Sequence, residues 1–193
     1  GDEARAIVVI EPDADPSTIR DYQRLGARGA RAFMLDGALL QWEDLPQLSR
    51  LIEPFGWHLQ IQMDGCTLPE YYPILASLDC PIVIDHNGKF LTPPSADDSE
   101  FGFLLRLLDN DNTWVKLSAP YETSRNGPPH YQDVSRLAKA LVAHRPDRLV
   151  WGSNFPHPGF SGITDERSLL SLLLSWTGGD VDLRKRILVD NPL

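Results

Sequence analysis

The fold of this chain is decided by one stretch, in which an apolar strand runs into a turn of small, polar and proline residues: Asp147-Arg148-Leu149-Val150-Trp151-Gly152-Ser153-Asn154-Phe155-Pro156-His157-Pro158. An earlier stretch has the same order, because residues 81–84 are mostly apolar and lead into Asp85, His86 and a glycine. In parallel β/α folds the catalytic and binding groups gather where the strands end. The two stretches therefore predict a parallel α/β fold whose active-site rim carries both histidines.

Apolar strands and amphipathic helices alternate along the rest of the chain. We expect six strands, each followed by helix, over residues 6–10, 30–35, 57–63, 82–85, 114–119 and 148–151. Residues 6–10 form a continuous apolar run typical of a strand that is covered on both faces. Residues 57–63 alternate polar and apolar side chains, and a closed barrel can turn such a polar face inward. We therefore predict one domain over residues 1–193, a barrel rather than an open doubly wound sheet.

The number of units does not fill a complete barrel. A closed (β/α)8 TIM barrel needs eight units and typically takes about 250 residues, whereas this chain offers six units in 193 residues. The chain could be a piece of a longer polypeptide, another chain could supply the missing units, or the sheet could be open and doubly wound. We prefer the first possibility, a piece of a longer polypeptide that forms an incomplete barrel, because six buried strands alone would leave two sheet edges unpaired.

Composition excludes several classes of function. The chain is 42% hydrophobic and 23% charged, as expected of a globular protein, and its formal net charge is -9. This charge repels nucleic acids and anionic membranes. No apolar run approaches the roughly 20 residues of a transmembrane helix, and the first residues do not resemble a signal peptide. We therefore expect a cytoplasmic protein with no nucleic-acid or membrane partner, and a homo-oligomer is compatible with the sequence.

Three residues of the rim are candidate catalytic groups: His86, Asn154 and His157. His86 ends a strand beside Lys89, a cation that could hold a carboxylate or an oxyanion. The alternative is that Asp85 caps the following segment and that His86 is an ordinary rim residue. His157 lies between two prolines, which restrict the backbone and so position the ring. Asn154 can orient a water molecule or a carbonyl but cannot accept a proton as a carboxylate does.

Other polar residues near the strand ends are candidates for substrate contact. Gln62 and Ser118 lie towards the carboxyl ends of their strands, and Tyr121 lies in the long loop that follows Ser118. A solvated loop is the alternative for Tyr121. The chain has no Gly-x-Ser-x-Gly elbow, phosphate-binding glycine loop or His-Glu-x-x-His helix, which argues against a serine hydrolase, a P-loop NTPase and a zincin.

Five segments in order resemble the amidohydrolase-related TIM-barrel family of the amidohydrolase 2 type, in particular its 2-pyrone-4,6-dicarboxylate lactonases and sugar-lactone hydrolases: Trp57-His58-Leu59-Gln60, Val83-Ile84-Asp85-His86-Asn87-Gly88, Trp114-Val115-Lys116-Leu117-Ser118, Val150-Trp151-Gly152-Ser153-Asn154-Phe155-Pro156-His157 and Ile187-Leu188-Val189-Asp190-Asn191-Pro192. The resemblance implies a metal-dependent hydrolase type of barrel, of which this chain holds strands three to eight. It also implies a hydrolase of a cyclic ester that carries carboxylates, in which water attacks the ring carbonyl.

The same resemblance implies roles for individual residues. His86 would polarise the carbonyl, Arg31 and Lys89 would bind the carboxylates of a small substrate, and Ser118 and Tyr121 would line the rim. Asn154 takes the position of the family's strand-eight acid. The wider family binds a divalent metal, zinc or manganese, for which His86 is a candidate ligand, whereas the lactonase branch is thought to work without metal. A metal-dependent decarboxylase and a catalytically silent barrel that binds a small acid or a protein are the alternatives.

Overall fold

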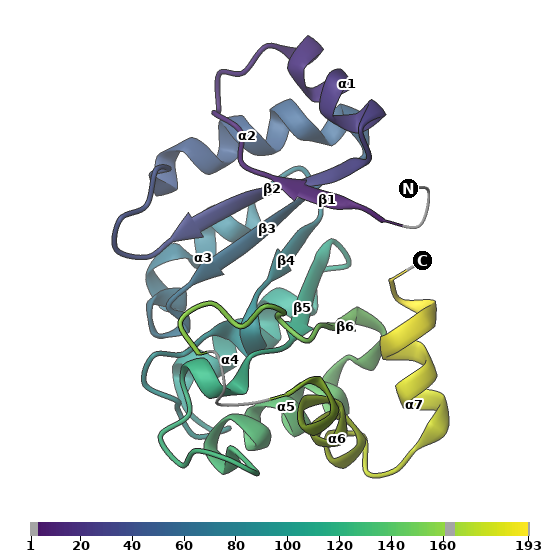
Figure 1. The fold of residues 1–193 in the computed structure, drawn as a ribbon. Helices are drawn as coiled ribbons and strands as arrows, with labels where there is room; N and C mark the ends of the chain where they lie inside the picture. The colour runs from purple at the N-terminus through teal and green to yellow at the C-terminus, as the bar shows by residue number, and fades with distance from the viewer. Residues whose placement is uncertain (1–3, 161–164, 193) are drawn as a thin grey trace.

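The computed structural model describes residues 4–160 and 165–192. Six parallel strands pair in sequence order and form a half-barrel within an α/β fold (Figure 1). The strands are β1 Ala6–Val8, β2 Ala27–Met34, β3 His58–Met63, β4 Ile82–Ile84, β5 Thr113–Leu117 and β6 Leu149–Trp151. The predicted α/β class and the parallel arrangement are therefore confirmed, and the half-barrel is consistent with the predicted incomplete barrel.

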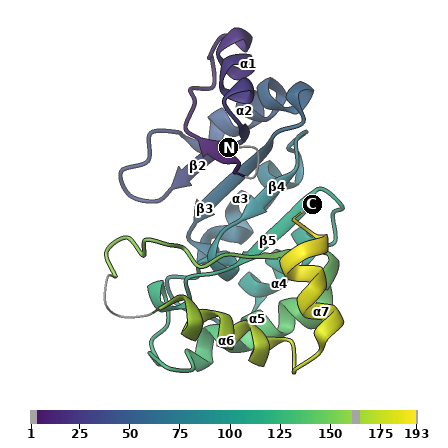
Figure 2. The same ribbon diagram turned by 45° about the vertical axis from the view of Figure 1, so that its right-hand side comes forward.

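Helices connect successive strands. The α-helices are α1 Pro16–Arg24, α2 Leu45–Ile52, α3 Leu68–Ala76, α4 Ser99–Leu108, α5 Gln132–His144, α6 Glu166–Trp176 and α7 Val181–Lys185. Short 3-10 turns supplement them: η1 Trp42–Asp44, η2 Glu53–Phe55, η3 Gly65–Thr67, η4 His86–Gly88, η5 Pro120–Glu122 and η6 Pro146–Arg148. Figures 1 and 2 show α1 and α2 beside the first strands and α5, α6 and α7 at the opposite end of the sheet.

Local sequence explains where these elements begin and end. Asp15 caps α1, because its side chain accepts a hydrogen bond from the backbone of Ser17 at 2.7 Å, and Pro16 occupies the first helical position. Alternate residues of β3 and β5, such as Leu59, Ile61 and Val115, are fully buried in the core. Their neighbours in sequence point to the other face of the sheet. The polar residues of these strands therefore lie on the inner face of the half-barrel.

Two strand predictions need correction. Strand 6–10 was expected to be covered on both faces, but β1 ends at Val8, and Val9 is 60% exposed. Among the described residues β1 pairs with β2 alone, so it is an edge strand with an open side. The strand expected over 30–35 already begins at Ala27, where small residues of low strand propensity pair with β1.

The last helical stretch changes its hydrogen-bonding pattern along its length. It is α-helical in α7 and then widens into the π-helical turn η7, Arg186–Asp190. Asn191 follows this turn, and its side chain donates to the backbone oxygens of Pro146 at 2.9 Å and Leu149 at 2.6 Å. The C-terminal helix therefore supports the start of β6, the strand that leads into the loop with Asn154.

Candidate active site

Asp85 is a wholly buried carboxylate at the end of β4 that links three strands. Its Oδ2 accepts hydrogen bonds from Arg31 on β2 and from Gln60 Nε2 on β3, the latter at 3.2 Å. Lys116 Nζ on β5 forms an ion pair with its Oδ1 at 3.0 Å. Arg31 also donates to Gln62 Oε1. The side chain of Asp85 thus holds two inward-facing cations rather than capping the following turn.

The turn after Asp85 has a rare backbone conformation. His86, Asn87, Gly88 and Lys89 all have positive φ, of 54°, 58°, 91° and 44° respectively. Each non-glycine residue in this region costs about 1–2 kcal/mol, and such strain clusters at functional sites. Asn87 Nδ2 stabilises the turn by donating to the backbone oxygen of Ser118 at 2.9 Å. The turn directs the side chains of His86 and Lys89 towards η5, which follows β5.

His86 is fixed by a contact with β5. Its Nδ1 lies 2.8 Å from Ser118 Oγ, and its side chain is 6% exposed. Burial lowers the pKa of His86 below its usual value, although the carboxylates of Asp85 and Glu122 act in the opposite direction. The imidazole is therefore neutral at neutral pH, and its Nε2 side faces the Glu122 carboxylate at a distance of 3.8 Å.

Glu122 is a carboxylate at the rim that the sequence analysis missed. Its Oε2 accepts a hydrogen bond from Lys89 Nζ, and its Oε1 accepts one from Asn154 Nδ2 at 2.9 Å. The side chain is only 11% exposed. Groups from three loops, which follow β4, β5 and β6, therefore meet at one carboxylate.

A second chain of hydrogen bonds leads from Asn154 away from this carboxylate. Asn154 Nδ2 also donates to the Tyr121 hydroxyl at 2.9 Å, and that hydroxyl lies 2.9 Å from His157 Nδ1. On its other side, His157 Nε2 lies 3.2 Å from Glu166 Oε1 at the start of α6. His157 thus contacts Asn154 through the Tyr121 hydroxyl and not directly.

The structure brings the predicted site residues into two adjoining groups. His86, Lys89, Ser118, Tyr121, Asn154 and His157 form the rim group around Glu122. Arg31 and Gln62 belong to the inner group around Asp85.

Sequence reasoning passed over Lys116 in favour of Ser118, although both face the same side of their strand. It gave no role to Glu122 or Glu166. Glu122 offered one usable signal, since it is an acidic residue directly after Tyr121 in a loop that follows a strand end.

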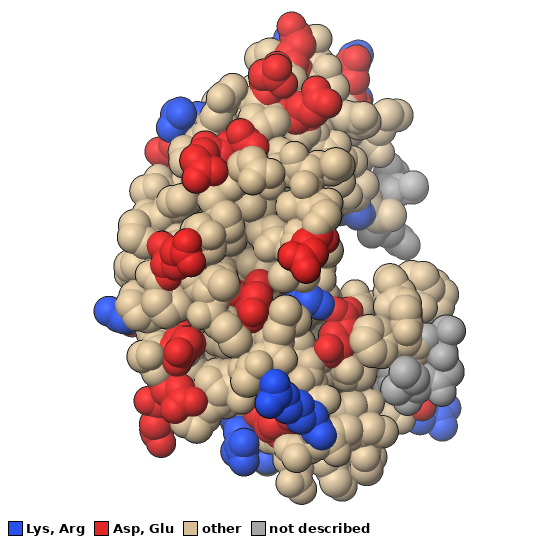
Figure 3. Space-filling view, turned by 90° about the vertical axis from the view of Figure 1, so that its left-hand side faces the viewer, with Lys and Arg blue, Asp and Glu red and all other residues tan. Residues whose placement is uncertain are grey.

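The face that carries the ends of the strands is predominantly acidic. Figure 3 views the side to which β2 points in Figure 1, and it shows a hollow in which acidic and basic side chains lie next to each other.

The pKa of the buried Asp85 carboxyl group reflects the charges that surround it inside the fold. Burial raises it, but Lys116, His86 and Arg31 together lower it below the usual value, so Asp85 stays ionised.

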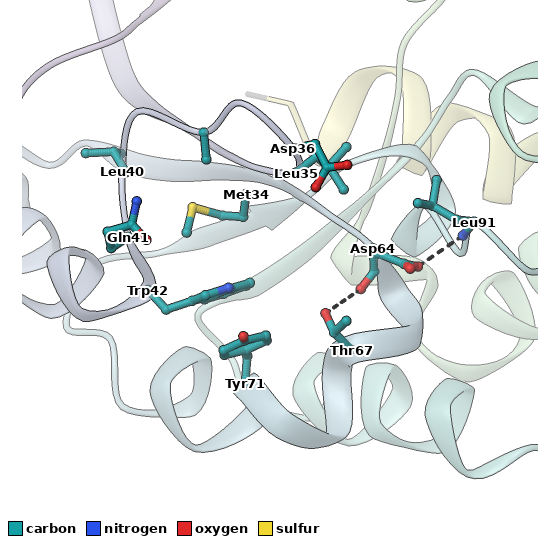
Figure 4. A pocket seen from close by; sticks show the side chains of 11 residues that line it. Met34, Leu35, Asp36, Leu40, Gln41, Trp42, Asp64, Thr67, Tyr71 and Leu91 are labelled. Atoms are coloured by element: carbon teal, nitrogen blue, oxygen red, sulfur yellow. Dashed lines mark hydrogen bonds between the residues drawn. The ribbon is translucent and has the colours of Figure 1, made fainter.

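A separate cavity of about 520 Å³ lies beyond the ends of β2 and β3 (Figure 4). Its lining includes Met34 and the stacked rings of Trp42 and Tyr71, whose centroids are 3.9 Å apart. Asp64, also in its wall, accepts hydrogen bonds from the backbones of Cys66 at 3.0 Å and Leu91 at 3.1 Å. None of the predicted site residues lines this cavity, so we place the candidate site at the polar rim instead.

The fold and the rim define the class of this protein, an α/β half-barrel that gathers ionisable side chains at the carboxyl ends of parallel strands. A family profile described as amidohydrolase matches residues 1–193. The chain therefore belongs to the amidohydrolase family, as its sequence motifs predicted.

Curated relatives of this chain are named as lactone-converting enzymes. D-galactarolactone isomerase of Agrobacterium fabrum is 33% identical over 195 residues, which cover 100% of this chain and 66% of the relative. The 2-pyrone-4,6-dicarboxylate hydrolase of Comamonas testosteroni is 28% identical over 204 residues, which cover 100% of this chain and 67% of the relative. The chain thus spans about two thirds of the length of these relatives.

Solved structures show the same fold. A ligand-free crystal structure of an Agrobacterium tumefaciens protein matches with a TM-score of 0.91 and 34% identity over 100% of this chain and 69% of that one. A Burkholderia multivorans amidohydrolase crystallised with bound zinc matches with a TM-score of 0.70 and 21% identity, over 99% of this chain and 73% of that one. At that identity the second likeness shows the fold alone.

The donor set at the rim does not by itself fit a divalent metal. Across residues 4–160 and 165–192, no three His, Cys, Asp or Glu side chains come together in an arrangement that could hold a metal ion. His86 and Glu122 offer one nitrogen and one carboxylate, but the carboxylate is already paired with Lys89. A metal ion bound there would lie beside the ammonium group.

The helices give no sign of a membrane span. In the part of the chain that the structure describes, none combines the length and the apolar composition needed to cross a lipid bilayer.

Proposed function

We propose that the protein is a hydrolase that opens the ring of a small lactone carrying a carboxylate, with water attacking the ring carbonyl. The observation that carries the proposal is the meeting of His86, Lys89, Glu122 and Asn154 at the ends of three neighbouring strands. Enzymatic hydrolysis of a carboxylated lactone uses a group that polarises the carbonyl, a group that accepts a proton and cations that bind the substrate carboxylate. The rim supplies a group for each of these needs.

The proposed roles follow from protonation and position. In the proposed tautomer His86 Nδ1 accepts a hydrogen bond from Ser118 Oγ, 2.8 Å away, and the single proton of the neutral ring on Nε2 polarises the carbonyl oxygen. Arg31 and Gln62 bind a substrate carboxylate from the inner group, since the Arg31 side chain remains 25% exposed beside Asp85. Lys89 and Tyr121 bind the substrate at the rim, and Asn154 orients the attacking oxygen. His157 positions Tyr121.

The nucleophile that attacks the ring carbonyl determines which of two reactions occurs. In a ring-opening hydrolase it is water, whereas in an isomerase it is a hydroxyl group of the substrate itself. The relative named D-galactarolactone isomerase shares 33% identity with this chain, which makes isomerisation of a sugar lactone the second candidate. Both reactions use the same polarised carbonyl and the same proton acceptor.

We further propose that β1 to β6 correspond to strands three to eight of an eight-stranded barrel, which forms a single domain. In support, the matches cover about two thirds of the relatives' length, and among the described residues β1 and β6 end the sheet. The two remaining strands would close the inner face that carries Arg31 and Lys116.

The test uses the intact protein with a panel of lactones, with and without carboxylates. Release of acid at constant pH measures hydrolysis, and nuclear magnetic resonance of the products detects isomerised lactones. We expect turnover of carboxylated lactones that the His86→Gln variant loses and that the His144→Gln variant keeps, because His144 pairs with Asp109 on the outer surface. Tight binding without turnover, or turnover only of a decarboxylation substrate with added metal, would overturn the proposal.

A further inference from the structure

Glu122 occupies a position in the rim that no other described carboxylate shares. It enters from η5 and is held by Lys89 from one side and by Asn154 from the other. Its Oε1 faces His86 Nε2 at 3.8 Å, which is too long for a hydrogen bond. The carboxylate and the imidazole therefore lie opposite each other without being directly bonded.

The other carboxylates near the rim are unsuited to accepting a proton. Asp85 is wholly buried and is bound by Arg31, Gln60 and Lys116, which together leave it ionised and occupied. Glu166 is 52% exposed and contacts the far nitrogen of His157. Among the described residues, Glu122 is thus the carboxylate that a substrate polarised by His86 would meet.

We infer that Glu122 is the general base and acid of the reaction, an inference that rests on the proposed lactone chemistry. Glu122 takes a proton from the attacking water as the water oxygen bonds to the ring carbonyl carbon. The π electrons of the carbonyl move to its oxygen, which His86 Nε2–H stabilises. The tetrahedral intermediate then collapses, the ring carbon–oxygen bond breaks, and the ring oxygen takes the proton back from Glu122. The products are the open hydroxy acid and the original carboxylate.

The neutral amide of Asn154 is compatible with Glu122 as the general base. Its amide donates to Glu122 Oε1 and to the Tyr121 hydroxyl, and so fixes the carboxylate without adding charge. A carboxylate at position 154 would instead lie within hydrogen-bond distance of Glu122. Two such carboxylates cannot both ionise easily, and one would take up a proton near neutral pH. The amide in the loop after β6 and the acid on η5 therefore form a complementary pair.

The experiment measures kcat and KM of the intact protein with a carboxylated lactone that the wild type turns over. Glu122→Gln keeps the size and the hydrogen bond to Lys89 but cannot accept a proton. We expect kcat to fall by about 10²- to 10⁴-fold with a small change in KM. Glu53→Gln, at an exposed acidic residue of η2, is the matched control and should retain the wild-type kcat.

Two further variants keep the test decisive. Glu122→Asp keeps the charge beside Lys89, but its shorter side chain moves the carboxylate oxygens away from the reacting atoms. We therefore expect kcat to fall while the fold is retained. The double variant Glu122→Gln with Asn154→Asp exchanges the acid and the amide between the two hydrogen-bonded positions. We expect it to recover part of the kcat lost in Glu122→Gln. Folding is checked by circular dichroism and by the melting temperature of each variant.

The outcomes separate the two proposals. If the wild type turns over a lactone and Glu122→Gln retains its kcat, the assignment of Glu122 is overturned while the proposed function stands. If the wild type opens or isomerises no lactone of the panel, the proposed function fails and the assignment falls with it.

Discussion

Lys116 Nζ lies 3.0 Å from Asp85 Oδ1, so a lysine near the end of β5 and an aspartate at the end of β4 form an ion pair inside the half-barrel. The aspartate is wholly buried, whereas the lysine side chain is 24% exposed towards the inner face. Arg31 completes the arrangement from β2. One buried negative charge thus holds two cations on the face where we place the substrate.

Replacing this charge should be strongly destabilising. Asp85→Asn leaves Arg31 and Lys116 close together without their counter-charge, and breaking a buried ion pair costs about 3–5 kcal/mol. Urea unfolding of the wild type and the variant measures the loss. The control is Asp111→Asn at an exposed surface pair with Arg145 and Arg148, where we expect almost no change. Equal effects of the two substitutions would contradict this account.

Stability should also depend on pH through the buried histidines. Burial lowers the pKa values of His58 and His86 below 6.5, the value each has in the unfolded chain. Between the folded and unfolded pKa values the unfolded state binds more protons, so the free energy of unfolding falls as pH falls below about 6.5. This part of the stability is fully present above that pH. Urea unfolding at pH 7.5, 6.5 and 5.5 should show the decline.

The contribution of His86 can be isolated with a variant. His86→Gln cannot take up the proton, so its unfolding free energy should fall less steeply between pH 6.5 and 5.5 than that of the wild type. His144→Gln is the control on the surface and should keep the wild-type slope. A variant of His86 with an unchanged slope would show that this ring is not buried as a neutral group.

The sequence predicted the position of a site residue where that residue directly follows a recognisable strand. His86 and Asn154 follow apolar runs, and strand periodicity placed both at the same edge of the sheet before any contact was known. Arg31 came from the motif resemblance, because its strand begins with small residues that periodicity does not mark.

Glu122 and the shape of the 86–89 turn could not be found in this way. Glu122 lies in a loop without periodicity, and its contacts with Lys89 and Asn154 join residues more than 30 positions apart. The positive φ angles of His86 and Lys89 are imposed by the surrounding structure, since residues other than glycine adopt that region only uncommonly. A residue whose place is set by tertiary contacts leaves little trace in its local sequence.

The hydroxyl of Tyr121 should stabilise the rim measurably. It bridges Asn154 and His157, so Tyr121→Phe leaves Nδ1 of a buried histidine and one amide hydrogen without this partner. A buried polar group that loses its partner costs about 1–3 kcal/mol. Tyr131→Phe is the matched control, because the buried Tyr131 hydroxyl has no hydrogen-bond partner among the described residues. Urea unfolding should show a loss for the first variant and none for the second.

The turn that carries His86 and Lys89 depends on Gly88. Its φ is +91°, and an added Cβ would lie 2.6 Å from Phe90 Cε2 and 2.7 Å from Leu104 Cδ2. Gly88→Ala therefore combines an unfavourable backbone region with overpacking, which we expect to cost about 2–4 kcal/mol in unfolding free energy. Because the turn positions two rim residues, kcat should fall as well. Gly102→Ala is the control within α4, where a Cβ meets nothing within 4 Å, and it should raise the unfolding free energy by about 0.5–1 kcal/mol. A stable and fully active Gly88→Ala variant would show that the rim does not need this backbone conformation.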